Sequence, residues 1–396
     1  MKTLLSVPPT LARSHPEWVS RVFGRSFATH DPEGSKLGSG GGTAHLLIEA
    51  WKDESPENSF ENWLSTEKRI LLHAGGQSRR LPAYAPCGKA LLPVPVLRWC
   101  NGQRIDQTLG ELQLPLLRKV LEAADEKTNT LVASGDVLVW NEAPLPPIPS
   151  ADVVCIGLWD SAETASGHGV FFAPRSNPSV FDFMLQKPAP EQVVEKTRNR
   201  LFLLDVGIWL LSDRAVSVLM RKCGWDGRSD PQDVLWEYDL YGSFGLALGE
   251  HPTVSDPEVG ELTAALVALP GAEFHHFGTS EDLLESSLAL QNRVNDQRRI
   301  LSPLIKPHPS IFIQNADVRC GLSPTNRQVW IENSLIPESW TIRQRHVFTG
   351  VPANAWSLDV PAGICLDFVP LKDGETAFRP YGFSDAFRGD PSDSGT

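Results

Sequence analysis

Short apolar runs recur through the first two thirds of the chain, and segments with helical spacing separate them. The runs at 70–72, 130–133, 153–158 and 201–204 each have the length of a buried strand. Between the first two runs, leucines recur at short, helix-like intervals over 109–124. Strands that alternate with helices in this way predict an α/β fold whose sheet has covered faces. In such sheets, ligands bind beyond the carboxyl ends of the strands.

The last third of the chain has a different period. Apolar residues lie at multiples of six positions apart, at Phe312, Val318, Trp330, Ile336, Ile342 and Phe348, with Pro324 interrupting the phase. Two Asn-small-x-aliphatic units, 315–318 and 333–336, lie 18 residues apart, which is three such periods. A six-residue period is typical of a parallel β-helix, in which every coil places the same positions in one core column. A small β-sandwich whose short strands fall near this spacing is the alternative.

These two patterns predict two domains, which the length of 396 residues also favours. We expect an α/β domain over 1–298, a β-helix domain over 299–385 and a disordered tail over 386–396. The proline-rich stretch 141–150 is expected to be a surface loop, because it is too short to link domains.

Composition excludes several classes of protein. The 36 basic and 48 acidic side chains give a net charge of −12, and no Lys/Arg block suits a nucleic acid. No stretch approaches the roughly 20 apolar residues that a membrane span needs. Pro8 and Pro9 interrupt the apolar start, so we expect no signal peptide. Six scattered cysteines without a C-x-x-C pair indicate reduced thiols in a cytoplasmic protein.

Two glycine-rich segments are candidates for phosphate binding. One precedes a helix-like stretch, and the other directly follows the predicted strand at 70–72. Glycines let a backbone approach phosphate oxygens closely, and the N–H groups that open a helix favour anions. The candidate nucleotide-binding residues are Gly38, Ser39, Gly40, Gly41, Gly42, Thr43, Gly75, Gly76, Ser78 and Arg79. Flexible surface loops have similar sequences, so the first segment alone leaves both interpretations open.

Three cations lie in and after the second glycine-rich segment. Arg79 and Arg80 are followed by Lys89, nine residues after Arg80 and within a Gly-Lys before an apolar Leu-Leu-Pro-Val. Arginine offers a planar fork and lysine a point charge, and both suit a triphosphate. The spacing is not that of the G-x-x-x-x-G-K-[ST] loop. A solvated basic loop is the alternative.

Acidic residues that could hold a metal or a substrate also follow predicted strands. Asp136 ends the run that begins at Leu131, so it is the best candidate for Mg²⁺, which prefers one or two carboxylates. A turn cap is the alternative role for it. Four further candidates for contacts with substrate are His168, Lys187, Asp205 and Asp239, and each could equally have a structural role.

The motifs resemble a known superfamily. Gly-Gly-x-Ser-x-Arg followed by Pro-x-Gly-Lys-x-Leu-x-Pro-Val is similar to the signature of sugar nucleotidylyltransferases. More narrowly, the chain resembles the L-fucose-1-phosphate guanylyltransferase module of bifunctional fucokinase/GDP-fucose pyrophosphorylases, roughly over residues 1–385. The segments that carry this resemblance are LGSGGGT (37–43), LLHAGGQSRRLPAYAPCGK (71–89), SGDV (134–137), FMLQKP (183–188) and LDVGIWLLSDRA (204–215).

The resemblance implies a Rossmann-like nucleotidylyltransferase domain followed by a left-handed parallel β-helix. It implies that GTP and L-fucose 1-phosphate react to give GDP-L-fucose and pyrophosphate. The chain would then be either a stand-alone transferase or part of a parent chain that also has a fucokinase domain. Segments 38–43 and 75–80 would hold the nucleotide. Arg80, Lys89 and Lys187 would be the catalytic cations, and Asp136 would hold Mg²⁺. Lys187 would hold the sugar phosphate, and Asp205 would face the sugar.

Two departures from the family pattern are visible. Gln186 stands where many relatives have Glu, and segment 277–282 lacks the carboxylate that precedes the glycine in relatives. The second metal ligand is therefore missing or supplied elsewhere. Two alternatives stay open: the same chemistry on another sugar 1-phosphate or with UTP, and a binding module that does not catalyse a reaction.

Overall fold

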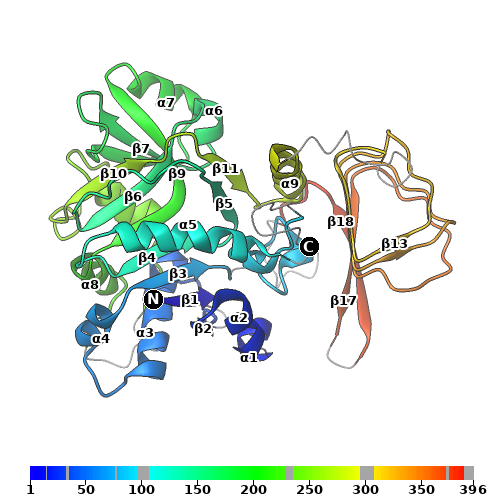
Figure 1. Cartoon of the computed structure of the whole chain (residues 1–396), viewed down its shortest axis with the longest axis horizontal. Helices are drawn as coiled ribbons and strands as arrows, with labels where there is room; N and C mark the ends of the chain where they lie inside the picture. The colour runs from blue at the N-terminus through cyan, green and yellow to red at the C-terminus, as the bar shows by residue number, and fades with distance from the viewer. Residues whose placement is uncertain are drawn as a thin grey trace. The chain divides into compact units, whose positions relative to one another are not determined.

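The computed structural model describes residues 1–14, 16–32, 35–75, 78–95, 107–225, 227, 235–294, 307–371 and 374–387. The chain divides into two compact units, each of which is built from several segments (Figure 1). The larger unit comprises Met1–Gly76, Cys87–Leu91 and Leu109–His275. The smaller unit comprises Gln77–Pro86, Leu92–Thr108 and His276–Thr396. The domain boundary predicted at 298/299 lies outside the described residues, as does most of the predicted tail.

A nine-stranded sheet forms the centre of the larger unit. Its main path has the order β10-β6-β9-β4-β3-β1-β2, and β7 joins β9 and carries β8 at its other edge. These strands are β1 (Lys2–Ser6), β2 (Ser26–Thr29), β3 (Arg69–His73), β4 (Thr130–Ser134), β6 (Val153–Leu158), β7 (Gly169–Pro174), β8 (Phe183–Gln186), β9 (Arg200–Leu211) and β10 (Ala264–Ala268). A second, two-stranded sheet pairs β5 (Val137–Trp140) with β11 (Glu273–His276). All four apolar runs singled out in the sequence lie in strands of the main sheet.

The sheet is mixed, and its directions decide which loops meet. Strands β1, β2, β3 and β4 run parallel to one another, whereas β9 runs antiparallel to both β4 and β6. The register aligns Ser6 with His73 and His73 with Ser134. The carboxyl ends of three parallel strands therefore lie in one row, at the edge where α/β sheets hold ligands.

Helices cover both faces of this sheet, as the sequence pattern predicts. They are α1 (Pro9–Ser14), α2 (Pro16–Phe23), α3 (Gly38–Glu54), α4 (Phe60–Thr66), α5 (Leu109–Ala123), α6 (Ala162–Ala165), α7 (Pro190–Lys196) and α8 (Asp213–Lys222). Leu71 of β3 packs in one apolar cluster with Leu47 of α3, and its neighbour Leu72 packs in a second cluster with Leu117 of α5. Successive residues of a strand point to opposite faces, so both faces need an apolar partner.

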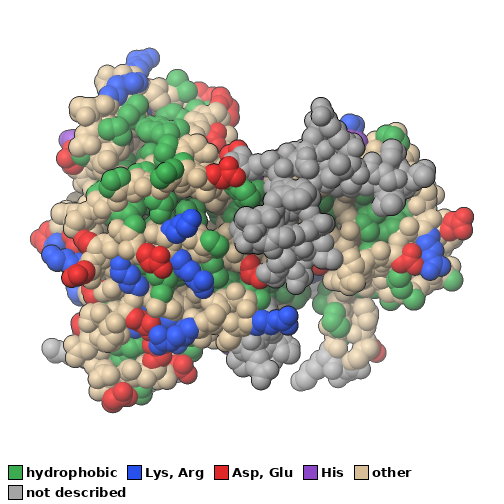
Figure 2. Space-filling view, viewed as in Figure 1, with side chains coloured by type: hydrophobic (Ala, Val, Ile, Leu, Met, Phe, Trp, Pro, Cys, Tyr) green, Lys and Arg blue, Asp and Glu red, His purple; other side chains and the backbone are tan. Residues whose placement is uncertain are grey.

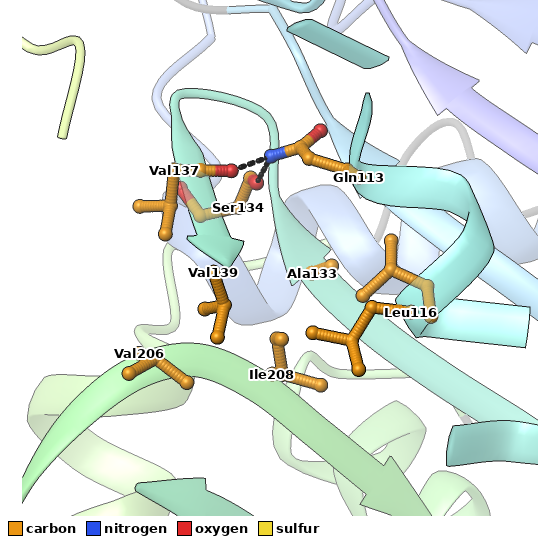
Figure 3. Close-up of a pocket in the computed structure, with 9 residues that line it drawn as sticks. Gln113, Leu116, Ala133, Ser134, Val137, Val139, Val206 and Ile208 are labelled. Atoms are coloured by element: carbon orange, nitrogen blue, oxygen red, sulfur yellow. Dashed lines mark hydrogen bonds between the residues drawn. The ribbon is translucent and has the colours of Figure 1, made fainter. Parts of the chain in front are cut away.

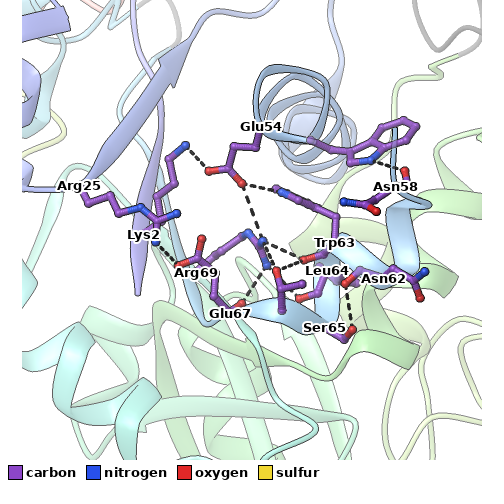
Figure 4. A network of polar contacts seen from close by, with 12 residues as sticks. Lys2, Arg25, Glu54, Asn58, Asn62, Trp63, Leu64, Ser65, Glu67 and Arg69 are labelled. Atoms are coloured by element: carbon purple, nitrogen blue, oxygen red, sulfur yellow. Dashed lines mark hydrogen bonds and ion pairs between the residues drawn. The ribbon is translucent and has the colours of Figure 1, made fainter. Parts of the chain in front are cut away.

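A network of polar contacts lies at the amino-terminal edge of the sheet, away from the row that ends β1, β3 and β4 (Figure 4). The fully buried Arg69 guanidinium donates to the carbonyls of Trp63 and Leu64 at 2.9 Å, in the last turn of α4. Glu54 accepts hydrogen bonds from Lys2 and from the Trp63 indole. These bonds satisfy carbonyls at the end of a helix, so this network stabilises the fold.

Three further expectations concern loops, thiols and surface. Residues 141–150 contain no helix or strand, as predicted. The described cysteines, Cys87, Cys155, Cys223, Cys320 and Cys365, are free thiols. None of the helices in the described ranges is both long and apolar enough to cross a membrane. Figure 2 shows Lys and Arg side chains lying among Asp and Glu side chains on the face in view.

The smaller unit contains parallel ladders whose paired residues lie 18 residues apart, or 17 for β14 (Val329–Glu332) and β16 (His346–Thr349). Four strands of one sheet pair in parallel, namely β12 (Ile311–Gln314), β14, β16 and β17 (Ile364–Pro370). Strand β18 (Thr376–Gly382) pairs antiparallel with β17 at the edge of this sheet. Strand β13 (Asp317–Val318) pairs with β15 (Leu335–Ile336), and helix α9 spans Ser280–Val294. Ile311 pairs with Val329, and Asp317 with Leu335, in both cases 18 residues on. This is the three-period spacing of the two Asn units. Asn315 donates its side-chain amide to Asn333 at 2.6 Å.

The core of this unit differs in one respect from the six-residue pattern. Ile336, Ile342 and Phe348 belong to its apolar cluster, and Val318 packs against that cluster. Phe312 and Trp330 are also buried, but they do not belong to this cluster; the residues next to them in the strands do. The two rings pack together with centroids 5.6 Å apart. Because successive strand residues face opposite sides, these two rings lie on the other face of the sheet.

Candidate active site

Two loops converge on the row of strand ends in the larger unit. Gly75 follows β3, and a Cβ on it would lie 3.0 Å from the Ser6 hydroxyl. Gly135 follows β4 and donates its N–H to the His73 carbonyl at 2.8 Å. A Cβ at Gly135 would lie 2.6 Å from that carbonyl oxygen, so only glycine fits there. The strand ends and their glycines thus build one compact edge.

The structure brings Lys89 and Asp136 together at this edge. The Lys89 ammonium donates to one carboxylate oxygen of Asp136 at 3.0 Å, and the Ser134 hydroxyl donates to the other at 2.7 Å. The Lys89 side chain is only 11% exposed and that of Asp136 is 24% exposed. Gly88 adopts a φ of +74°, and a Cβ on it would lie 2.6 Å from the Ala74 carbonyl. A glycine is therefore required for the chain to deliver Lys89 to this position.

A residue that the sequence did not reveal holds the turn with Asp136. The side-chain amide of Gln113, on α5, donates to the Ser134 carbonyl at 3.0 Å and to the Val137 carbonyl (Figure 3). These carbonyls lie on either side of Asp136 in the chain. Gln113 is 6% exposed, and a polar residue on the buried face of an apolar helix was the one signal for it.

The first glycine-rich segment packs closely against residues 236–240. The N–H groups of Gly40 and Gly41 donate to the Tyr238 carbonyl at 2.9 and 3.1 Å. A Cβ on Gly38 would lie 2.5 Å from the same oxygen, and Gly38 has a φ of +70°. Glycine is thus required here by the approach of another backbone. Two amides that open α3 are directed at a protein carbonyl in this structure.

Ser39 and Thr43 connect α3 to its neighbours. The Ser39 hydroxyl accepts from the Leu240 N–H at 2.8 Å, and the Thr43 hydroxyl donates to the Ser39 carbonyl at 2.8 Å. The same Thr43 oxygen lies 2.9 Å from Nε2 of His73. Burial lowers the pKa of His73, so the ring is neutral at pH 7 and its Nε2–H donates to Thr43. This bond ties the start of α3 to the end of β3.

Asp205 is a buried carboxylate on β9. It accepts from the Gly207 N–H at 2.8 Å and from the Trp209 indole at 3.1 Å. Burial raises the pKa of Asp205 to about 6, although these two bonds oppose the shift. A Cβ on Gly169 would lie 3.0 Å from its second oxygen, so this side of the carboxylate faces the β7–β8 hairpin.

Tyr241 is a second residue that sequence reasoning missed. Burial raises its pKa, and the nearby carboxylates of Asp205, Asp136 and Asp239 act in the same direction. Three of the predicted acidic residues therefore lie near enough to this phenol to disfavour its ionised form. Asp239 itself accepts from the N–H groups of Tyr241 and Gly242, at 2.8 and 2.7 Å, and caps the short helix that follows.

His168 and Lys187 meet at the end of the β7–β8 hairpin. The Lys187 N–H donates to the His168 carbonyl at 2.9 Å, and Lys187 has a φ of +48° with an exposed side chain. The His168 ring packs edge-on against Phe274, with centroids 4.9 Å apart. Gly169, the residue after His168, lies against Asp205. Three of the four predicted substrate contacts, His168, Lys187 and Asp205, are thus neighbours in the larger unit.

The arginines of the second glycine-rich segment belong to the smaller unit. Arg79 donates to the Phe387 carbonyl at 3.3 Å, and Arg80 is exposed. Ser78 has a φ of +43° and accepts from the Leu81 N–H through its carbonyl. Gly76 lies outside the described residues.

Within the described residues, one group of three side chains could hold a metal ion, and it does not include Asp136. Its members are Asp182, Glu250 and His251. Asp182 is already paired with Arg200 and lies 2.5 Å from Nδ1 of His251, so the group has a structural explanation. The oxygen donors at Asp136 and Ser134 suit a hard cation such as Mg²⁺, which needs only one or two carboxylates besides substrate phosphates.

Comparisons with known proteins agree with the motifs. The L-fucokinase/L-fucose-1-P guanylyltransferase of Bacteroides fragilis is 52% identical over 397 residues, which cover 100% of this chain and 41% of that protein. The bifunctional fucokinase/GDP-fucose pyrophosphorylase of Arabidopsis thaliana is 28% identical over 299 residues, covering 66% of this chain and 28% of that protein. The chain thus spans about two fifths or less of the length of these relatives.

Among solved structures, the crystal structure of mannose-1-phosphate geranyltransferase from Thermus thermophilus covers 96% of this chain and 95% of its own. Its sequence identity of 15% and TM-score of 0.34 are too low to support an argument. The sequence model of the fucose pyrophosphorylase domain family matches residues 62–255, which include Lys89, Asp136, Lys187 and Asp205. Over residues 62–255 the chain is therefore similar to the fucose pyrophosphorylase domain family, which its motifs also resemble.

Proposed function

We propose that this chain transfers GMP from GTP to L-fucose 1-phosphate and releases pyrophosphate. The observation that carries the proposal is the Lys89–Asp136 pair at the carboxyl edge of the sheet, within the matched residues 62–255. A cation and a carboxylate beside a glycine turn are the groups that triphosphate chemistry needs.

The reaction is an in-line displacement at the α-phosphorus of GTP. An oxygen of the sugar phosphate forms the new bond to this phosphorus, and the bond to the bridging oxygen of the β-phosphate breaks. The electron pair leaves with pyrophosphate. Because a phosphate monoester is already an anionic nucleophile, no general base is required. Catalysis then consists of positioning the reactants and stabilising the charge that develops.

Cations of the chain would supply most of that stabilisation. Lys89 would neutralise charge on the α-phosphate and on the departing pyrophosphate, with Arg80 in the same role. Asp136 would hold Mg²⁺, which supplies charge neutralisation at the phosphates when it is bound. Segments 38–43 and 75–80, including Arg79, would contact the nucleotide. In segment 38–43, the amides of Gly40 and Gly41 are already bonded, so other groups there would make the contacts.

The β7–β8 hairpin and its neighbours would bind the sugar phosphate. Lys187 is exposed and would pair with the phosphate. The second oxygen of Asp205, which faces the hairpin, would accept a sugar hydroxyl, a favourable partner for a buried carboxylate. His168 is its neighbour on the hairpin, and Asp239 would contribute through the loop that carries Tyr241.

We also infer that the parallel ladders of the smaller unit form a left-handed β-helix. The supporting observation is the 18-residue offset of the β12–β14 and β13–β15 pairs, which matches three six-residue periods. A Rossmann-like first domain, a cytoplasmic location, and a fucokinase domain as partner in a longer parent chain belong to the same proposal. We propose no nucleic-acid or membrane partner.

The test is pyrophosphate release with Mg²⁺ and L-fucose 1-phosphate, comparing GTP with UTP and ATP. We expect release with GTP alone, and loss of release with Lys89→Ala as the control for contaminating activity. Release with UTP, or only with another sugar 1-phosphate, would support the first alternative. Calorimetric binding of GTP without release of pyrophosphate from any sugar phosphate would support a module that binds without catalysis.

A further inference from the structure

We infer that Gln113 is a positioning residue that fixes the turn presenting Asp136 to the metal and the phosphates. The inference rests on the proposed function, since it gives Asp136 the role of metal ligand. It concerns a residue that contacts neither substrate in the proposed mechanism.

The geometry of the contact is specific. Residues 134–137 form a tight turn between β4, which ends at Ser134, and β5, which begins at Val137. The two hydrogens of one amide nitrogen bridge the carbonyls on either side of Gly135 and Asp136 (Figure 3). A single side chain thereby closes the open side of the turn. Glutamate, leucine or methionine at this position could not donate both bonds.

The surroundings of Gln113 are apolar, so a glutamine is unfavourable there if its only role is to stabilise the fold. Apolar side chains line the small pocket beside it, namely Leu116, Leu117, Ala133, Val139, Val206 and Ile208. Its own carbonyl oxygen is buried and has no hydrogen-bond partner among the described residues. A buried acceptor without a partner is unfavourable, so the amide oxygen lowers stability while the amide nitrogen holds the turn.

The consequence for Asp136 follows from how the carboxylate is held. Ser134 and Lys89 fix its two oxygens, but Ser134 is itself part of the turn. If the carbonyls of the turn rotated away, Asp136 and the Ser134 hydroxyl would move together and the pair with Lys89 would lengthen. Misplacement of a functional group by 1 Å can cost about 100-fold in rate.

The experiment compares Gln113→Met with Leu117→Met in the full chain. Both variants place methionine in the same pocket, but only the first removes the donors to the turn. Mn²⁺, which shares the oxygen ligands of Mg²⁺, is titrated in the presence of GTP, and free Mn²⁺ is followed by electron paramagnetic resonance. We expect Gln113→Met to weaken Mn²⁺ binding about tenfold. Leu117→Met should keep Mn²⁺ affinity within a factor of two of the wild type. It should shift the melting temperature about as much as Gln113→Met does.

A second variant and a second readout keep the test decisive if Gln113→Met does not fold. Gln113→Glu retains the shape of the side chain and replaces the donor nitrogen by oxygen, so it should show the same weakening. The Mg²⁺ concentration that gives half-maximal pyrophosphate release should rise in parallel, while KM for L-fucose 1-phosphate stays unchanged.

The outcomes separate the two proposals. If the wild-type chain binds Mn²⁺ and releases pyrophosphate, and either Gln113 variant folds with unchanged Mn²⁺ affinity, the positioning role is wrong and the proposed function stands. If the wild-type chain releases no pyrophosphate and binds no Mn²⁺ with GTP, the proposed function fails, and the inference about Gln113 fails with it.

Discussion

Lys89 combines a chemical and a structural role in one side chain. It is nearly buried, and its ammonium is paired with a carboxylate that is itself mostly buried. Removing one member of such a pair leaves the other without a counter-charge in a poorly solvated place. A loss of activity on substitution therefore has to be measured together with stability.

We expect Lys89→Met to lower kcat by about 10²–10³-fold, the usual effect of losing one group that stabilises the transition state. The free energy of unfolding should also fall, by about 1–3 kcal/mol, because Asp136 loses the ammonium that balances its charge. Steady-state pyrophosphate release and urea unfolding at pH 7 measure the two effects. Asp136→Asn is the matched control, since it removes the charge of the partner. Turnover like that of the wild type in Lys89→Met would exclude this lysine from the mechanism.

Asp205 makes a second prediction at the scale of single residues. Its pKa in the folded chain, about 6, lies above the ordinary value of an aspartate. The folded state therefore binds the proton more tightly than the unfolded state, so stability is greatest below about pH 4 and falls as the pH rises from about 4 to about 6. Above that range the ionised carboxylate costs at most about 3 kcal/mol.

Asp205→Asn should remove this cost while its side chain can still accept the bonds from Gly207 and Trp209. We expect the free energy of unfolding to rise by about 1–3 kcal/mol at pH 8 and to change little at pH 4. The same substitution should raise KM for the sugar phosphate, because a carboxylate is the stronger acceptor for a hydroxyl. Urea unfolding at the two pH values tests the first part. An equal change at both values would mean that burial does not perturb this carboxyl.

At the scale of one element, two glycines of helix α3 differ in whether their surroundings leave room for a side chain. Gly38 has a positive φ, and a Cβ on it would lie 2.5 Å from the Tyr238 carbonyl. Gly42 lies within the helix, and a Cβ on it would meet Asp31 and His73 only at ordinary contact distances of 3.6 Å or more. Four residues apart, one position forbids a side chain and the other permits it.

We expect Gly38→Ala to lower the free energy of unfolding by about 1–3 kcal/mol through strain and overpacking. Gly42→Ala should leave stability unchanged or raise it by up to about 1 kcal/mol, because alanine is the better helix former. Thermal and urea unfolding of the two variants give the comparison. If Gly42→Ala also raised KM for GTP without loss of stability, the predicted contact of this segment with nucleotide would gain support. Equal destabilisation by both variants would contradict the packing explanation.

At the scale of the whole molecule, the second glycine-rich segment is divided between the two units. Gly75 lies in the larger unit, whereas the loop with Ser78, Arg79 and Arg80 packs with the C-terminal strands. Tyr84 donates to Glu332 of β14, and Arg379 of β18 donates to the Pro82 carbonyl at 3.0 Å. Contacts within the smaller unit therefore hold the loop with Ser78, Arg79 and Arg80, which the sequence predicts to contact the nucleotide.

Tyr84→Phe removes one of these bonds without changing the ring. We expect KM for GTP to rise about 3–10-fold, while the melting temperature falls by only a few degrees, as for the loss of one hydrogen bond to a charged group. Arg319→Ala, which breaks an exposed pair with Asp317 in the same unit, is the control and should change neither quantity much. An unchanged KM in Tyr84→Phe would separate this loop from nucleotide binding.

The elements with strong local signals were predictable from the sequence. Strand β3 and helix α5 follow from an apolar run and from helical spacing, and the 18-residue offset of β13 and β15 follows from the two Asn units. The sequence also placed Asp136 at a strand end and Lys89 near the loop that follows the strand at 70–72. Their contact follows from the parallel pairing of β3 with β4, which aligns the ends of both strands.

What the sequence by itself determined, then, is local: periodic apolar segments, glycines at turns, and the kinds of charged groups available. The tertiary structure decided which of these meet. Only the packing of 236–240 on α3 explains why Gly40 and Gly41 donate to a protein carbonyl, and only the position of α5 makes Gln113 a partner of the turn before Val137. Burial likewise decided the raised pKa of Asp205. These contacts join residues distant along the chain, and no local pattern specifies such distances, because they depend on how whole elements pack.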